Sequence, residues 1–302
     1  MAFGENPLRH LMSNEQGTQA TQGTATQAET LAPTVFAKAE RLLAEHETPL
    51  DSFTDLYGPE SIARDQQYVA SCETLFAKKE QEQRREGHVH TEAVNRASKV
   101  FEAMAFEGIR AHGWLGPDAV PFRTTRFDDY KNGIDLVTEI QRGEDPTEHL
   151  ALAIDVTFGQ KAQERKFERI REEILKEELG KIKYFRSERN GFRGELSMIP
   201  KVIVGIEPRN VIRMSRLWAN DEKKLEILPA QMAMLEEVRD QLEAFSTFAK
   251  QNNKIPVIRA YAQAKRIVAR IIGEKKKLMN YQTLDDDRVY RAILESARMF
   301  NS

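Results

Sequence analysis

Three acidic residues, Asp135, Glu139 and Asp155, lie within apolar stretches that have the composition of β-strands. Asp135 and Glu139 belong to GIDLVTEI, residues 133–140, and Asp155 belongs to LALAIDVTF, residues 150–158. Burying an unpaired carboxylate costs a large part of a domain's net stability, so buried acids are usually paired with a cation or bound to a metal. These three acids are therefore candidates for a functional site.

Side chains alternate between the two faces of a strand, which decides which residues can meet. In residues 150–158 one face carries large apolar side chains, and the other carries Ala151, Ala153, Asp155 and Thr157. In residues 133–140 the same alternation places Asp135 and Glu139 on one face. If the two strands pair as a hairpin, Asp135 or Glu139 can meet Asp155 on a shared surface.

Carboxylates that converge on a sheet surface repel one another unless a cation lies between them. A hard divalent ion, Mg²⁺ or Mn²⁺, prefers such oxygen ligands and would be stabilised there. An ion of this kind orients a water molecule and neutralises the charge that builds up on a phosphoryl oxygen. The chemistry that these acids would support is hydrolysis of a phosphodiester bond.

The elements that must position these acids follow from the periodicity of apolar residues. We expect a helix, three strands, a charged helix and a last strand, at residues 91–113, 120–127, 133–140, 150–158, 160–180 and 197–208. This order predicts an α/β fold with a mixed central sheet and a helix–strand–strand–strand–helix–strand core.

The rest of the chain is expected to add a tail and helices to this core. A Gln- and Thr-rich composition predicts a disordered tail over residues 1–33. Amphipathic periodicity predicts a helical region over 34–90, the α/β core over 91–216 and a second helical region over 217–302. Within the core, Asp128 and Asp129 precede YKNG, which favours a turn before the hairpin more than a metal-binding role.

The core, about residues 91–207, resembles the PD-(D/E)xK nuclease superfamily. A glycine turn followed by an acid in NGIDLV, and a hairpin partner with an acid near its end in AIDVT, carry this resemblance. It implies that Asp135 and Asp155 bind the metal and take part in catalysis. It also implies an additional carboxylate on the preceding helix, for which Glu102 and Glu107 are candidates, while Glu139 is a further candidate ligand.

The chain departs from the family's motif at the lysine. That residue would lie two positions after Asp155, where the sequence has Thr157, and threonine cannot supply a positive charge. A lysine at the start of the next helix, Lys161 or Lys166, can replace it, and we assign the role to Lys161. The chain is thus a candidate Mg²⁺-dependent endonuclease or exonuclease, a hydrolase acting on DNA or RNA.

A purely structural interpretation of the acids stays open. Asp135 can pair with Arg123, Arg126 or Lys131, and Asp155 can cap the next helix or pair with an arginine. The chain would then be a non-catalytic nucleic-acid-binding or assembly protein with a degenerate nuclease-like fold. A third alternative is an interaction protein without any role in nucleic-acid chemistry.

Two basic clusters bear on the partner. Residues 181–216 contain nine Lys and Arg against three Glu, and residues 254–277 contain eight against one. Such clusters suit a phosphate backbone, although the second is equally typical of the solvated face of a helix. In the first cluster the predicted nucleic-acid-binding residues are Lys181, Lys183, Arg186, Arg189 and Arg193.

Composition narrows the class of protein further. The longest aliphatic runs are far shorter than the roughly 20 residues of a membrane span, so no membrane partner is expected. The single cysteine, Cys72, excludes an internal disulfide and a multi-cysteine zinc site, and a cytoplasmic location is expected. The sequence has no motif of a serine hydrolase, zincin, P-loop NTPase or Rossmann enzyme.

Overall fold

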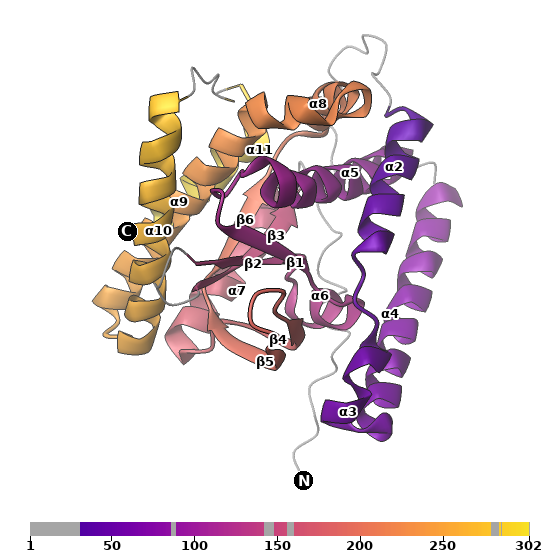
Figure 1. Ribbon diagram of the computed structural model, residues 1–302, viewed down its shortest axis with the longest axis horizontal. Helices are drawn as coiled ribbons and strands as arrows, with labels where there is room; N and C mark the ends of the chain where they lie inside the picture. The colour runs from indigo at the N-terminus through magenta and orange to yellow at the C-terminus, as the bar shows by residue number, and fades with distance from the viewer. Residues whose placement is uncertain are drawn as a thin grey trace.

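The computed structural model describes most of the chain after its first thirty residues: 31–85, 89–141, 148–155, 160–278, 284 and 286–301. Helices at both ends of this mixed α/β chain surround a four-stranded sheet (Figure 1). Residues 1–30 of the predicted tail lie outside the described residues, and Pro33 already begins a helix. None of the described helices is long and apolar enough to cross a membrane.

The region before the sheet is helical, as predicted. Its elements are α2 (Pro33–Glu45), η1 (Leu50–Phe53), α3 (Thr54–Tyr57), α4 (Pro59–Arg85) and α5 (Val89–His112). Apolar residues four positions apart in α2, namely Val35, Ala39 and Leu43, lie on one face and are buried in the main core. That core also contains the apolar face of α5, so α2 is held on the sheet domain by hydrophobic burial.

The central sheet has the strand order β1-β2-β3-β6. Its strands are β1 (Ala119–Arg123), β2 (Leu136–Ile140), β3 (Glu148–Asp155) and β6 (Lys201–Gly205). The first two pairings are antiparallel, and β3 pairs with β6 in parallel. A parallel neighbour requires a long crossover connection. That connection contains α7 (Gln160–Lys176) and a separate antiparallel pair, β4 (Gly180–Arg186) and β5 (Arg193–Ile199).

The segment predicted as a strand over 120–127 followed by a turn is divided differently. β1 ends at Arg123, and a short helix, α6 (Arg126–Asn132), replaces the turn. The side chain of Thr125 accepts a hydrogen bond from the backbone N–H of Asp128, which caps the helix. Gly133, in the left-handed region at φ 62°, ends it. The prediction missed α6 because a seven-residue helix is too short to show periodicity.

The stretch predicted as a single strand over 197–208 contains parts of two strands that belong to different sheets. β5 ends at Ile199 and β6 begins at Lys201, on either side of Pro200. Proline has no N–H group for a ladder and restricts the residue before it, so it separates the two strands. The hairpin formed by β4 and β5 was not predicted.

Helices follow β6 to the end of the described chain. They are α8 (Pro208–Asn220), η2 (Glu222–Ile227), α9 (Pro229–Gln251), α10 (Ile255–Leu278), α11 (Arg288–Arg298) and η3 (Met299–Asn301). The helix α9 closes the β6 edge of the sheet with side chains instead of a strand. The Gln241 amide accepts from the N–H of Ile203 at 2.8 Å and donates to its C=O at 2.6 Å, and Glu237 accepts from the N–H of Gly205 at 3.2 Å.

We expect Gln241→Leu to lower the free energy of unfolding by about 2–4 kcal/mol, because a buried N–H and a buried C=O of Ile203 lose their partner. Urea denaturation followed by circular dichroism measures this loss. The matched control is Gln251→Leu, an exposed position at the end of the same helix, which should be within about 0.5 kcal/mol of the wild type. Equal stability of the two variants would contradict the edge-closing role.

Candidate functional site

The strand register brings Asp135 and Asp155 to the same end of the sheet. Leu136, the first residue of β2, pairs with Leu152 near the end of the antiparallel strand β3. Asp135 directly precedes β2, and Asp155 is the last residue of β3. The backbone of Asp155 is described, opposite Gly205 of β6, whereas its side chain lies outside the described part of the structure. This proximity was predicted from the alternation of the two strands.

Two carboxylates, Glu102 and Asp135, act electrostatically on Asp129, and we call these three residues the carboxylate cluster. Burial and the negative charges of Asp135 and Glu102 hold the pKa of Asp129 well above its usual range. The positive charges of Arg123 and Lys166 act in the opposite direction. The cluster therefore joins α5, α6 and the start of β2, with one cation from β1 and another from α7 beside it.

Asp129 is the site residue that the sequence interpretation missed. It was assigned to a turn, and only the formation of α6 places it beside Glu102 and Asp135. The one signal in the sequence was its position between two strand-like stretches that each contain an acid. That position alone cannot distinguish a turn aspartate from one that lies beside other carboxylates, because the difference depends on the packing of α6.

Glu102 is already paired with a cation. Its Oε1 accepts from Nε of Arg123 at 2.9 Å, and both side chains are mostly buried. Arg123 also donates to the C=O of Leu43 at 3.2 Å, which fixes the guanidinium between α2 and α5. Arg123 was one of the cations that the structural interpretation offered to Asp135, and it forms an ion pair with Glu102.

The structure distinguishes the two lysines of α7 that were candidates to replace the motif lysine. Lys161 lies in the first turn of the helix, and its side chain lies outside the described part. Lys166 lies one and a half turns later, and its charge lowers the pKa of Asp129. Among the described side chains, Lys166 is therefore the lysine of α7 whose field acts on the carboxylate cluster.

Glu139 does not belong to this cluster. It lies four residues after Asp135, which separates the two positions by roughly 13 Å along an extended strand. Glu139 pairs across the sheet with Val120 and His149, and its side chain is buried with 1% exposed. Whichever face Asp135 takes, the strand holds Asp135 and Glu139 too far apart to bind one ion.

Oxygen-rich side chains suit a hard divalent cation, so the cluster fits Mg²⁺ or Mn²⁺ in donor chemistry. Within the described residues, however, no three His, Cys, Asp or Glu side chains are arranged to hold a metal ion. The side chain of Asp155, the ligand that the resemblance implies, lies outside the described part of the structure. The cluster can therefore contribute to a metal site, and the described part does not complete one.

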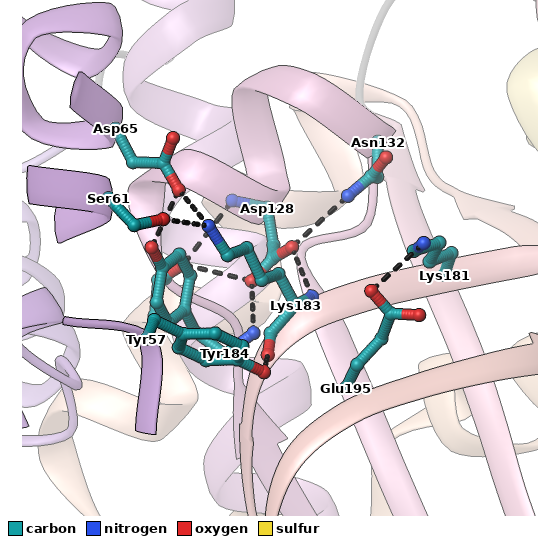
Figure 2. A network of polar contacts seen from close by, with 10 residues as sticks. Tyr57, Ser61, Asp65, Asp128, Asn132, Lys181, Lys183, Tyr184 and Glu195 are labelled. Carbon is teal, nitrogen blue, oxygen red and sulfur yellow. Dashed lines mark hydrogen bonds and ion pairs between the residues drawn. The ribbon is translucent and has the colours of Figure 1, made fainter. Parts of the chain in front are cut away.

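Most of the predicted nucleic-acid-binding residues are engaged within the protein. Nζ of Lys183 lies 2.5 Å from Oδ2 of Asp65 and donates to Ser61 at 3.0 Å (Figure 2). The ammonium group also lies over the rings of Tyr57 and Tyr184, 4.9 and 5.0 Å from their centroids. These contacts fasten α4 to β4, so Lys183 has a structural role whatever else it binds.

Three of the other basic side chains of this group have a polar partner within the protein, and the fourth does not. Lys181 pairs with Glu195 across the hairpin at 2.9 Å, Arg193 pairs with Asp55 at 2.9 Å, and Arg189 donates to the C=O of Asp118. Arg186 is exposed and makes no ion pair with any residue that the structure describes. Nucleic-acid binding by this cluster stays a prediction, and Arg186 is its one member without a polar partner among the residues that the structure describes.

Asp128, next to Asp129, has a different environment. Its carboxylate is fully buried and accepts hydrogen bonds from the backbone N–H groups of Lys183 at 2.7 Å and Tyr184 at 3.0 Å, and from Asn132 at 3.1 Å (Figure 2). Burial raises the pKa of Asp128, and these donors oppose the rise. Asp128 is thus a structural clamp between α6 and β4.

Comparison of the chain with protein-family models, with curated proteins and with solved structures finds no significant match. The geometry of the cluster must therefore carry any argument about function.

We expect Asp128→Ala to destabilise the protein by about 2–4 kcal/mol, because two backbone N–H groups of β4 lose their buried acceptor. Urea denaturation at pH 7 measures the loss. The exposed change Asp51→Ala is the control, since it removes an aspartate whose one side-chain hydrogen bond is made at the surface. A loss below about 0.5 kcal/mol in Asp128→Ala would refute the clamp.

The neighbouring change Asp129→Asn should have the opposite sign. Because the pKa of Asp129 is raised in the folded state, its contribution to stability is complete below the unfolded-state pKa and is lost as the pH rises towards the folded-state pKa. The variant should therefore melt at a higher temperature than the wild type at pH 8, with a smaller difference at pH 4. Calorimetric scans at both pH values test this, and a lower melting temperature at pH 8 would contradict the repulsion.

Proposed function

We propose that the chain is a metal-dependent, nuclease-like hydrolase of the PD-(D/E)xK type that acts on phosphodiester bonds of nucleic acid. The observation that carries the proposal is the position of Asp129, which feels the negative charges of Asp135 and Glu102, at the sheet end where β3 ends in Asp155. Stable folds rarely bring like charges together without a compensating role, and a divalent cation would turn this repulsion into binding energy.

The order of elements supports the proposal independently of the acids. Helix α5 is followed by β1, β2, β3, α7 and β6, which is the succession that the resemblance implies. Two insertions, α6 and the β4–β5 hairpin, interrupt it. The first insertion supplies Asp129, so this chain adds its own acid to the site that the resemblance would place on Asp135 and Asp155.

In this proposal Asp135 and Asp155 hold Mg²⁺ or Mn²⁺. Asp129 or Glu102 either binds a water molecule of the ion or is a further ligand. The bound ion would supply a polarised phosphoryl oxygen and an activated water. The family's motif lysine is replaced by Thr157 in this chain. In its place Lys166 offsets the negative charge that develops on the phosphate. Arg123 holds Glu102 in a fixed position through their 2.9 Å ion pair.

A non-catalytic relative of this fold is the second candidate, and one observation favours it. The ion pair between Glu102 and Arg123 already compensates one acid of the cluster without any metal. In that case the cluster would be part of a scaffold, and the protein would bind nucleic acid or a partner through its basic surfaces.

Calorimetric titration of Mn²⁺ should show binding to the wild type and at least about tenfold weaker binding to Asp135→Asn, because one charged ligand is lost. The exposed change Glu60→Gln in α4 is the matched control and should bind as the wild type does. A parallel cleavage assay uses single- and double-stranded DNA and RNA. Equal Mn²⁺ affinity in Asp135→Asn, or no binding by the wild type, would contradict the proposed metal-dependent hydrolase.

The lysine assignment is tested separately. We expect Lys166→Met to lower the cleavage rate about 100-fold while Mn²⁺ binding persists, because the lysine acts on the substrate's charge and not on the metal. Lys161→Met should cleave within a few-fold of the wild type. The reverse result, loss of cleavage in Lys161→Met alone, would return the role to Lys161.

A further inference from the structure

The helix α10 packs one face into the core and exposes the other. Its buried residues are Val257, Tyr261, Ala264, Val268, Ile271 and Ile272. The exposed residues include Arg259, Arg266 and Arg270, which we call the arginine stripe, and Gly273. At 3.6 residues per turn these four positions fall within about 60° of the helix circumference. The helix lies on the side of the molecule away from α4 (Figure 1).

The basic residues of α10 differ in their partners. Two of its lysines bind within the protein: Lys265 pairs with Glu243, and Lys275 donates to Gln231 at 2.7 Å. Lys254, directly before the helix, lies 3.5 Å from Glu177. In contrast, Arg259 makes no polar contact with any residue that the structure describes. Arg266 donates only to the C=O of Ala262 of its own helix, at 3.4 Å.

Gly273 has no role in the packing of the protein. Its backbone is helical, and a Cβ atom built there would have no atom of another element within 4 Å. Glycine in an exposed helix interior lowers stability relative to alanine, so nothing inside the protein favours it here. A glycine next to exposed arginines leaves room for a partner to approach the helix backbone closely.

We propose that the arginine stripe and Gly273 form a docking surface for the sugar-phosphate backbone of a nucleic acid. The inference rests on the proposed function and deepens it, because it names a second contact surface away from the carboxylate cluster. Tyr261 of α10 contacts the C=O of Lys201, the first residue of β6, whereas the cluster lies at the end where β3 and β6 finish. A substrate held there would extend beyond the site of cleavage.

The chemistry of the stripe favours phosphate over other anionic partners. Arginine presents a planar fork of donors that binds phosphate oxygens in a bidentate manner. A helix that lies on a membrane surface needs large apolar residues on its exposed side to enter the lipid. The stripe carries no such residue between Arg259 and Gly273, and the apolar face of α10 is buried in the core.

Fluorescence anisotropy with labelled DNA and RNA strands, in EDTA to prevent cleavage, tests the proposal on the full chain. Arg259→Ser combined with Arg266→Ser should bind at least tenfold more weakly than the wild type. The slope of log affinity against log salt should become shallower by about 1–2, because two phosphate contacts are lost. The control variant, Arg41→Ser with Lys224→Ser, removes two exposed charges on α2 and η2 and should bind as the wild type does.

The glycine provides a second measurement that does not depend on charge. Gly273→Leu should melt at or above the temperature of the wild type and bind nucleic acid more weakly. Unchanged binding in both the Gly273 and the double arginine variants would overturn the docking surface. So would binding of the wild type to phosphatidylserine vesicles, but not to nucleic acid, with loss in the same variants.

The two proposals fail in distinguishable ways. In one outcome, Mn²⁺ binding depends on Asp135 and the nucleic-acid affinity is unchanged by substitutions in the arginine stripe. This result would overturn the docking surface and leave the proposed function standing. Affinity that depends on the stripe, without Mn²⁺ binding, would leave a nucleic-acid-binding protein and overturn the hydrolase.

Discussion

The pairing of β3 with two different neighbours is the constraint on which the site depends. Its antiparallel partner β2 begins where β3 ends, and its parallel partner β6 ends at the same place. Asp135, Asp155 and the connection to α8 are therefore brought to one end of the sheet. The parallel pair requires a crossover, and α7 brings Lys166 to the cluster as part of that crossover.

Two adjacent aspartates have opposite electrostatic environments. Asp128 is fully satisfied by backbone donors from β4 and stabilises the fold. Asp129 faces two other carboxylates, which penalise its ionised form. An arrangement of this kind is typical of sites where stability is given up for function.

The N-terminal helices explain why much of the first basic cluster is unavailable as free positive charge. Asp65 of α4 accepts from both Lys183 and the hydroxyl of Tyr184, and Asp55 of α3 pairs with Arg193. These pairs attach α3 and α4 to the β4–β5 hairpin, which is a small two-stranded sheet that gains stability from such packing. In α10, by contrast, Arg259 and Arg266 are exposed and make no ion pair with any residue that the structure describes.

The sequence by itself determined the class of the fold and the strands that contain the acids. Alternation of apolar residues is a local property, so β2, β3, α7 and the terminal helices could be predicted, and with them the nearness of Asp135 and Asp155. Only the tertiary structure decided the partners. Lys183 and Asp65 are 118 residues apart, and the charge of Glu102 acts on Asp129 only because α6 forms and packs on α4 and β4. Burial and charge pairing between distant segments depend on how the elements pack, and no local pattern records that packing.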